Sequence, residues 1–316
     1  MHFVFCFVFI NALGNCLTTG FRVIAYESSP WEEEWLAMDE QQHYHVCSLL
    51  ASEHHLTRSK WAVHRSQTLK RSTAINALPP LQFEMRDIFS RFIVEDDSGQ
   101  LSTKWIEPLV GQLRDPLTWC ENLRADAGEF EPTEGWIQAK RFLLPLLEPI
   151  PPPRRFILMD LGASLYVSWG RDPTAVGAKW FVDVYARFGI VPDLVISMEK
   201  VHYPQEQLFD SPPAHLLGKY LYMNVGVASD PGARFNPWSI LANVARPDDF
   251  VLVKLDVDNK EIELELARQL LHNATVQSLV DEFFFEFHPD EEHKAHNAFA
   301  FFKKLRVAGV RAHFWP

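Results

Sequence analysis

The chain has 316 residues, of which 30 are Lys or Arg and 41 are Asp or Glu, so its formal net charge is −11. A hydrophobic fraction of 47% is ordinary for a globular protein and argues against wholesale disorder. A pI near 5.6 argues against a nucleic-acid partner, because nucleic-acid binders normally present a basic face.

An apolar segment opens the sequence. Residues from Phe3 to Leu13 are apolar except for Asn11, which makes the run about half of the ~20 residues that span a bilayer. We therefore expect residues 1–20 to form a signal peptide or signal anchor, although no Lys or Arg precedes the run. A buried strand or a misplaced start codon would give the same pattern. A true signal predicts the secretory pathway, either the Golgi lumen or secretion, and any membrane contact would be through this segment. Without a signal the chain would be cytoplasmic.

Four cysteines are too few for a disulfide scaffold, and their spacing fits no zinc site. Cys6 and Cys16 lie in or beside the apolar segment, which leaves Cys47 and Cys120. These two form either one disulfide, in an oxidising compartment, or two isolated buried thiols. Asn273-Ala274-Thr275 is a glycosylation sequon that matters only if the chain is secreted.

Residues 21–150 are expected to form a mainly helical region. The pattern of apolar residues predicts helices over Pro30–Leu50, Phe83–Val94, Trp105–Leu113 and Trp136–Leu147. The turn Asp96-Asp97-Ser98-Gly99 separates the second predicted helix from the third. The proline-rich stretch from Pro149 to Pro153 then marks a boundary to a second domain, residues 151–316.

Apolar strands alternate with helices in this second domain. The predicted strands are Arg155–Leu161, Asp193–Met198, Tyr220–Val227, Phe250–Leu255 and Val280–Phe287. The predicted helices are Lys179–Phe188, Ile262–Leu271 and Asn297–Val307. Such an alternation is typical of an α/β fold with a doubly wound, mostly parallel sheet that is covered on both faces.

Acidic residues stand where these strands end. In open α/β sheets, ligands bind outside the carboxyl ends of the strands, at the point where the strand order reverses. The acids at four of these ends are Asp160, Glu199, Asp256 with Asp258, and Glu286, which is followed closely by His288. This distribution suggests a site that meets hydrogen-bond donors or cations.

Two of these ends predict a nucleoside ligand. Gly162, just after Asp160, would let the backbone approach a ligand closely. Glu199 is well placed to accept both hydroxyls of a ribose. The phosphate-binding G-x-G-x-x-G pattern is absent, since Ser164 and Tyr166 stand where glycines are needed. We therefore expect a nucleoside without a pyrophosphate.

Several of these residues resemble the motifs of a known family. Asp160-Leu161-Gly162-Ala163 resembles the first motif of class I S-adenosylmethionine-dependent methyltransferases. The segment Lys254–Glu261 is similar to the FkbM-type pattern Lys-x-Asp-Val-Glu-Gly-x-Glu, with Asp258-Asn259 in place of Glu-Gly. Glu286-Phe287-His288 is similar to the Glu-x-His of that family, and Asn224–Val227 is similar to its third-strand region. The resemblance covers about residues 155–316 and implies a Rossmann-like methyltransferase fold.

The resemblance also implies S-adenosylmethionine as cofactor and a role for each motif residue. Asp160, Gly162 and Ala163 would line the methionine part of the cofactor. Glu199 would hold its ribose, and Asn224 would add a further contact. Asp256 would sit near the sulfonium and the acceptor, a hydroxyl of a small molecule or glycan.

His288 is the candidate base for an O-methyl acceptor, because imidazole titrates near neutral pH; a supporting hydrogen-bond role is the other reading. Asp256, Asp258 and Glu286 have the oxygen ligands that Mg²⁺ takes. We expect no metal, since acids beside a sulfonium need none.

Two other functions remain open. Asp256-Val257-Asp258 at the end of an apolar strand suits a divalent ion in a nucleotide-sugar glycosyltransferase. The altered motifs also suit a non-catalytic binding protein that keeps the methyltransferase fold. The sequence leaves the oligomeric state open.

Overall fold

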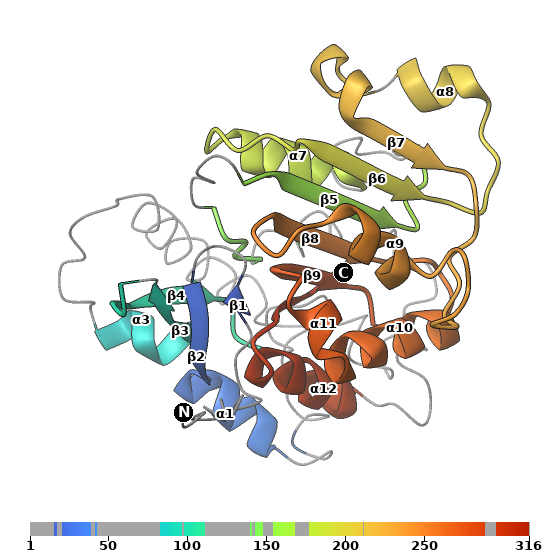
Figure 1. The fold of residues 1–316 in the computed structure, drawn as a ribbon. Coiled ribbons are helices and arrows are strands. Elements are labelled where there is room, and N and C mark those ends of the chain that lie inside the picture. Colours follow the sequence, from blue (N-terminus) through green and yellow to red (C-terminus); the bar gives the residue numbers. More distant parts are fainter. Residues whose placement is uncertain are drawn as a thin grey trace, which may run out of the picture.

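The computed structural model describes residues 16–17, 21–38, 42, 83–96, 98–110, 140, 143–147, 154–167, 177–210, 212–287 and 295–315. These residues form a six-stranded parallel sheet and a four-stranded antiparallel sheet (Figure 1). The prediction of an α/β fold with a parallel sheet is therefore confirmed.

The parallel sheet has the order β10-β9-β8-β5-β6-β7. Its strands are β5 (Phe156–Leu161), β6 (Leu194–Met198), β7 (Tyr220–Met223), β8 (Phe250–Leu255), β9 (Glu282–Phe285) and β10 (Arg311–Phe314). Numbered along the chain within this sheet, the order is 3-2-1-4-5-6, which is compatible with a Rossmann-like fold. The order reverses between β5 and β8, where Asp160 is paired with Lys254. The site that the acids predict should therefore lie beyond these two strands.

Helices cover both faces of this sheet. Successive residues of a strand point to opposite faces, and they pack into two different cores. Ile157 and Met159 point to the core that includes α9 (Pro237–Val244), α10 (Lys260–His272) and α12 (Ala295–Val307). Phe156 and Leu158 point to the core that includes α7 (Ala178–Ala186). The shorter elements are α8 (Gln205–Asp210), the 3₁₀ helix Ala214–Lys219 and α11 (Ala274–Gln277).

Sequence patterns did not reveal β10. Its residues Arg311 and His313 are polar, and a strand with such residues reads as exposed. Both side chains are nevertheless fully buried, because acidic side chains on neighbouring segments pair with them. Burial of charge is rare enough that an apolar-run criterion overlooks this strand.

The prediction of a mainly helical N-terminal region is wrong for its described part. The antiparallel sheet there consists of β1 (Cys16–Leu17), β2 (Phe21–Glu27), β3 (Ser90–Asp96) and β4 (Leu101–Ile106). The helices of this region with described bounds are α1 (Pro30–Ala37) and α3 (Phe83–Ile88). The predicted helix over Phe83–Val94 therefore ends at Ile88 and is followed by the strand β3. Residues 101–106 form the strand β4, which includes the start of the predicted helix Trp105–Leu113.

Side-chain alternation explains this correction. In β3, Phe92 and Val94 are buried while their neighbours are partly exposed, which is the period of a half-buried strand. The turn that starts at Asp96 was located correctly, and it joins β3 to β4 as a hairpin. Residues 107–110, inside the predicted helix Trp105–Leu113, and residues 143–147, at the end of the predicted helix Trp136–Leu147, are not helical.

Several sequence predictions fall on other parts of the chain. Residues 1–15, Cys47, Cys120 and the stretch Pro149–Pro153 lie outside the described residues, so the signal, the disulfide and the domain boundary stay predictions. Among the described residues, no helix is long and apolar enough to cross a membrane.

Candidate functional site

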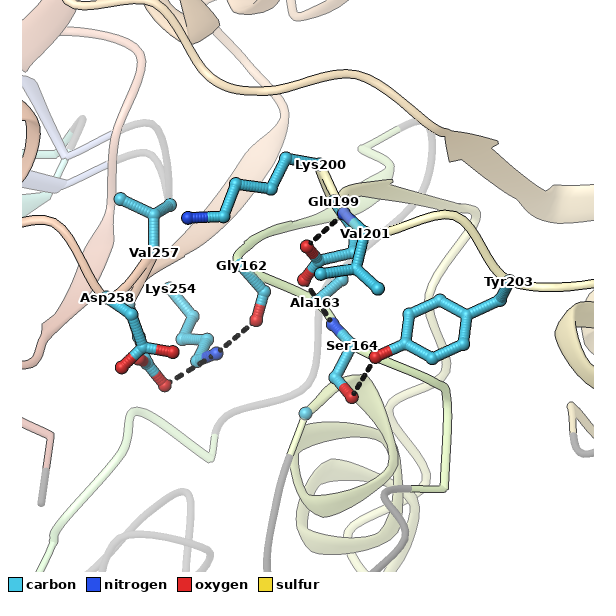
Figure 2. Close-up of a pocket in the computed structure, with 12 residues that line it drawn as sticks. Gly162, Ala163, Ser164, Glu199, Lys200, Val201, Tyr203, Lys254, Val257 and Asp258 are labelled. Atoms are coloured by element: carbon cyan, nitrogen blue, oxygen red, sulfur yellow. Dashed lines mark hydrogen bonds and ion pairs between the residues drawn. The ribbon is translucent and has the colours of Figure 1, made fainter.

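A cavity of about 250 Å³ lies at the carboxyl ends of β5, β6 and β8, where the strand order reverses (Figure 2). The turn after β5, the loop after β6 and the segment after β8 form its walls. Its lining residues are Gly162, Ala163, Ser164, Gly177, Glu199, Lys200, Val201, Tyr203, Lys254, Asp256, Val257 and Asp258. The structure therefore brings together most of the residues that the sequence placed in the site.

Gly162 has a positive φ of +77° and lies against the neighbouring strand. A Cβ atom added there would be 1.5 Å from the carbonyl oxygen of Asp256. The amides of Gly162 and Ala163 both donate to the carbonyl of Met198, at 3.0 and 3.2 Å. This glycine is thus required by the packing of β5 between β6 and β8, in addition to any approach of a ligand.

Glu199 forms one wall of the cavity and is fixed in place by backbone amides. Its carboxylate accepts hydrogen bonds from the amide of Ser164 at 3.1 Å and from that of Val201 at 2.7 Å (Figure 2). Each oxygen keeps lone pairs for a further donor. The carboxylate can therefore accept two hydroxyl groups from a ligand without moving.

Ser164 is held in a left-handed backbone conformation, with φ of +49°. Tyr222 donates its hydroxyl to the Ser164 carbonyl at 3.0 Å, and the Ser164 hydroxyl lies 3.4 Å from that of Tyr203. The backbone of this turn thus adopts a conformation that favours glycine, although the residue is serine.

Lys254 supplies a buried positive charge at the base of the site. Its ammonium lies 2.8 Å from Asp256 and 3.4 Å from Asp160, and it donates to the carbonyl of Gly162 at 3.0 Å. Burial raises the pKa of Asp160 even though the charge of Lys254 opposes this shift. Burial also disfavours the ammonium, but the two carboxylates outweigh it and raise the pKa of Lys254. Lys254 is the one charged residue in the apolar run Phe250–Leu255, and this feature of the sequence could have predicted a functional role for it.

Three carboxyl groups gather beside this lysine. Oxygens of Asp256, Asp258 and Glu286 lie within 4.8 Å of one another. Asp258 has a φ of +54°, and Glu263 fixes this loop by accepting the amide of Val257 at 2.7 Å. Such a group can bind a cation, and Lys254 already places one against Asp256.

Lys140, from the N-terminal region, reaches the same edge of the sheet. Its ammonium lies 4.1 Å from the ring centre of Trp315, and the residue is 4% exposed. Burial, followed by the charge of Lys254, lowers its pKa to about 7, although Asp256 and Glu286 oppose the shift. Sequence reasoning missed this residue because nothing in its local pattern distinguishes it from a surface lysine.

Three predicted site residues, Asp160, Asn224 and His288, are not among those that line the cavity. Asp160 is fully buried behind its wall. Asn224 donates its side-chain amide to the carbonyls of Glu199 and Val201, at 2.9 and 2.7 Å, so it braces the loop after β6. It does not line the cavity. His288 lies outside the described residues, so its role as base stays a prediction.

Comparisons of the chain with protein-family models, with curated proteins and with solved structures found no match. The function proposed below therefore depends on the residues and geometry of this site alone.

Proposed function

We propose that the chain is an S-adenosylmethionine-dependent methyltransferase that transfers a methyl group to a hydroxyl of a small molecule or sugar. The observation that supports this best is the place of Glu199. Its carboxylate is fixed at the end of β6 and borders a cavity whose other walls are the Gly162 turn and the acids after β8. In dinucleotide-binding folds a carboxylate accepts a hydrogen bond from the ribose hydroxyl, and Glu199 would serve a nucleoside in the same way.

The charges of the cavity suit this cofactor. Three carboxylates and two ammonium groups line it, namely those of Glu199, Asp256, Asp258, Lys200 and Lys254. The fully buried Asp160 adds a further acid behind them. The net negative environment attracts a sulfonium cation, and Val201 and Tyr203 offer apolar and aromatic surface beside Glu199 for a base.

The residues of the chain would then act mainly by positioning. The bound cofactor would supply an activated methyl group on a sulfonium sulfur. Asp256, which Lys254 holds at 2.8 Å, would orient the acceptor hydroxyl beside that group. Correct orientation of two reactants supplies much of the rate of an in-line displacement.

Ligand-dependent thermal unfolding tests this proposal. S-adenosylmethionine or S-adenosylhomocysteine, at about 100 times its Kd, should stabilise the protein by about 2.7 kcal/mol and raise its Tm by several degrees. A Tm that neither compound moves would contradict the proposal.

Replacing Glu199 by glutamine is expected to weaken binding of S-adenosylhomocysteine by about 10- to 100-fold, because two charge-assisted hydrogen bonds to the ribose are lost. Isothermal titration measures the affinity, and circular dichroism checks the fold. Glu206→Gln removes an exposed carboxylate from α8, outside the cavity, and serves as the matched control. Equal affinities of the two variants would assign Glu199 a purely structural role.

The acid group after β8 supports a second candidate, a metal-dependent nucleotide-sugar glycosyltransferase. Asp256 and Asp258 would then bind a divalent ion that bridges the diphosphate. A Tm raised by a UDP-sugar with Mn²⁺, and unchanged by S-adenosylhomocysteine, would favour this candidate. A non-catalytic binding protein would show a Tm raised by S-adenosylhomocysteine but no methyl transfer.

A further inference from the structure

Asn273-Ala274-Thr275 is a motif that the proposed function does not use, and it is the only Asn-x-Ser/Thr sequence in the chain. Asn273 follows α10 and is the N-cap of α11, and all three residues of the motif are exposed. The next apolar residues, Val276 and Leu279, are buried in the same core as α10 and α12. Buried neighbours therefore hold the motif at a defined place on the surface of the folded protein.

The side chain of Asn273 caps α11 through its oxygen alone. Its Oδ1 accepts hydrogen bonds from the amides of Thr275 at 3.0 Å and Val276 at 3.3 Å. Its Nδ2 makes no hydrogen bond to another residue that the structure describes. An N-linked glycan is attached through this nitrogen, so the oxygen can remain the cap after modification. The helix cap and a glycan are therefore compatible on the same side chain.

The motif lies at the edge of the parallel sheet opposite the cavity. α10 begins at Lys260, close after Asp258 of the cavity wall, and its 13 residues extend for about 20 Å before Asn273. Beyond α11, Asp281 is tied to the start of β8, since its amide donates to the Val251 carbonyl at 2.9 Å and its carboxylate accepts the Val251 amide at 2.7 Å. A bulky group on Asn273 would therefore leave the mouth of the cavity open.

We propose that Asn273 carries an N-linked glycan, which the chain receives in the lumen of the secretory pathway. The co-substrate is an oligosaccharide joined to a lipid through a diphosphate. A bond forms between Nδ2 of Asn273 and the anomeric carbon of the sugar, while the bond from that carbon to the diphosphate oxygen breaks. Nδ2 gives one proton to a base of the transferase, and the lipid diphosphate leaves. The hydroxyl of Thr275 completes the motif that the transferase recognises. The site does not depend on the proposed methyltransferase activity.

The test is expression of the full chain in cultured eukaryotic cells, followed by electrophoresis before and after digestion with peptide N-glycosidase. The wild type should lose apparent mass in a single step on digestion. The enzyme hydrolyses the modified amide, so mass spectrometry should then find aspartate at position 273. The folded protein should be digested as completely as the denatured protein, because Asn273 is exposed.

Three variants provide the controls. Thr275→Val removes the hydroxyl of the motif and should abolish the mass shift, whereas Thr275→Ser keeps the hydroxyl and should retain it. Asn273→Asp keeps the oxygen that caps α11 but has no amide to modify, so it should match the digested wild type in both mass and Tm. A wild type whose mass the enzyme does not change would overturn the proposal. A mass shift that persists in Thr275→Val would place the glycan elsewhere and would overturn it as well.

Discussion

Replacing Gly162 by alanine is expected to destabilise the protein by about 4 kcal/mol or more, or to prevent folding. The new Cβ would lie 1.5 Å from the Asp256 carbonyl oxygen and 2.9 Å from the Cα of Val257. Both contacts are with backbone, which cannot rotate away as a side chain can. The end of β8 would have to separate from β5, and the amide of Asp256 would lose its 3.0 Å hydrogen bond to Leu161. Denaturant unfolding gives the free energy.

Gly189→Ala is the matched control for this substitution. Gly189 has a φ of +74°, almost that of Gly162, but no atom lies within 4 Å of a Cβ added there. Its replacement therefore measures the conformational cost alone, which is about 1–2 kcal/mol. Equal losses for the two variants would mean that the turn at Gly162 moves aside at no cost, and that β5 and β8 are not tightly joined at the site.

The same contact ties stability to function. Gly162 borders the cavity with its backbone, and the Asp256 carbonyl that it touches belongs to the segment that presents the acids. A variant of Gly162 that still folds should therefore lose affinity for S-adenosylhomocysteine as well as stability.

The sheet and the acidic edge could be predicted because their signals are local. Continuous apolar runs such as Phe250–Leu255 identify strands buried on both faces, and the residue that ends each run is at the carboxyl edge. Asp160, Glu199 and Asp256 were found in this way. Glu199 and Asp256 meet at one cavity, with Asp160 buried behind it, because neighbouring parallel strands end at the same edge of the sheet.

The missed features depend on contacts between distant segments. Lys140 precedes the proline-rich stretch, outside the domain that carries the other residues of this edge. Its ammonium is buried against Trp315, which lies far along the chain. The strands β3 and β4 are short and carry charged residues, so helical and strand periods fit them almost equally well. Arg311 and His313 become buried only because acids elsewhere in the chain pair with them.

A buried network of charges joins the N-terminal region to the parallel sheet. Arg306 on α12 is completely buried and pairs with Glu107 at 3.2 Å and with Glu32 at 3.6 Å. It also donates to the carbonyl of Ala312 at 2.9 Å and to the hydroxyl of Tyr26 at 3.0 Å. One guanidinium thus connects α1, β2, the segment after β4, α12 and β10.

Replacing Arg306 by methionine is expected to destabilise the protein by about 3–5 kcal/mol, because the variant leaves two carboxylates buried with less opposing charge. Thermal and denaturant unfolding measure this loss. The N-terminal sheet should separate from the parallel sheet in the variant, and amide exchange in β2 and β3 should report that separation.

Lys303→Met provides the control on the same helix. Lys303 pairs with Glu33 at 2.8 Å, but both side chains are substantially exposed, at 32% and 57%. Solvent screens such a pair, so its loss should cost at most about 1 kcal/mol. Arg306→Met could instead lower the free energy of unfolding by no more than Lys303→Met does. In that case methionine replaces the guanidinium without a loss of stability, and the buried acids are neutralised by protons or solvated by water. The N-terminal region would then be held by its apolar contacts, through Trp35, Phe89 and Trp105 in the shared core, and the ionic network would only select the arrangement.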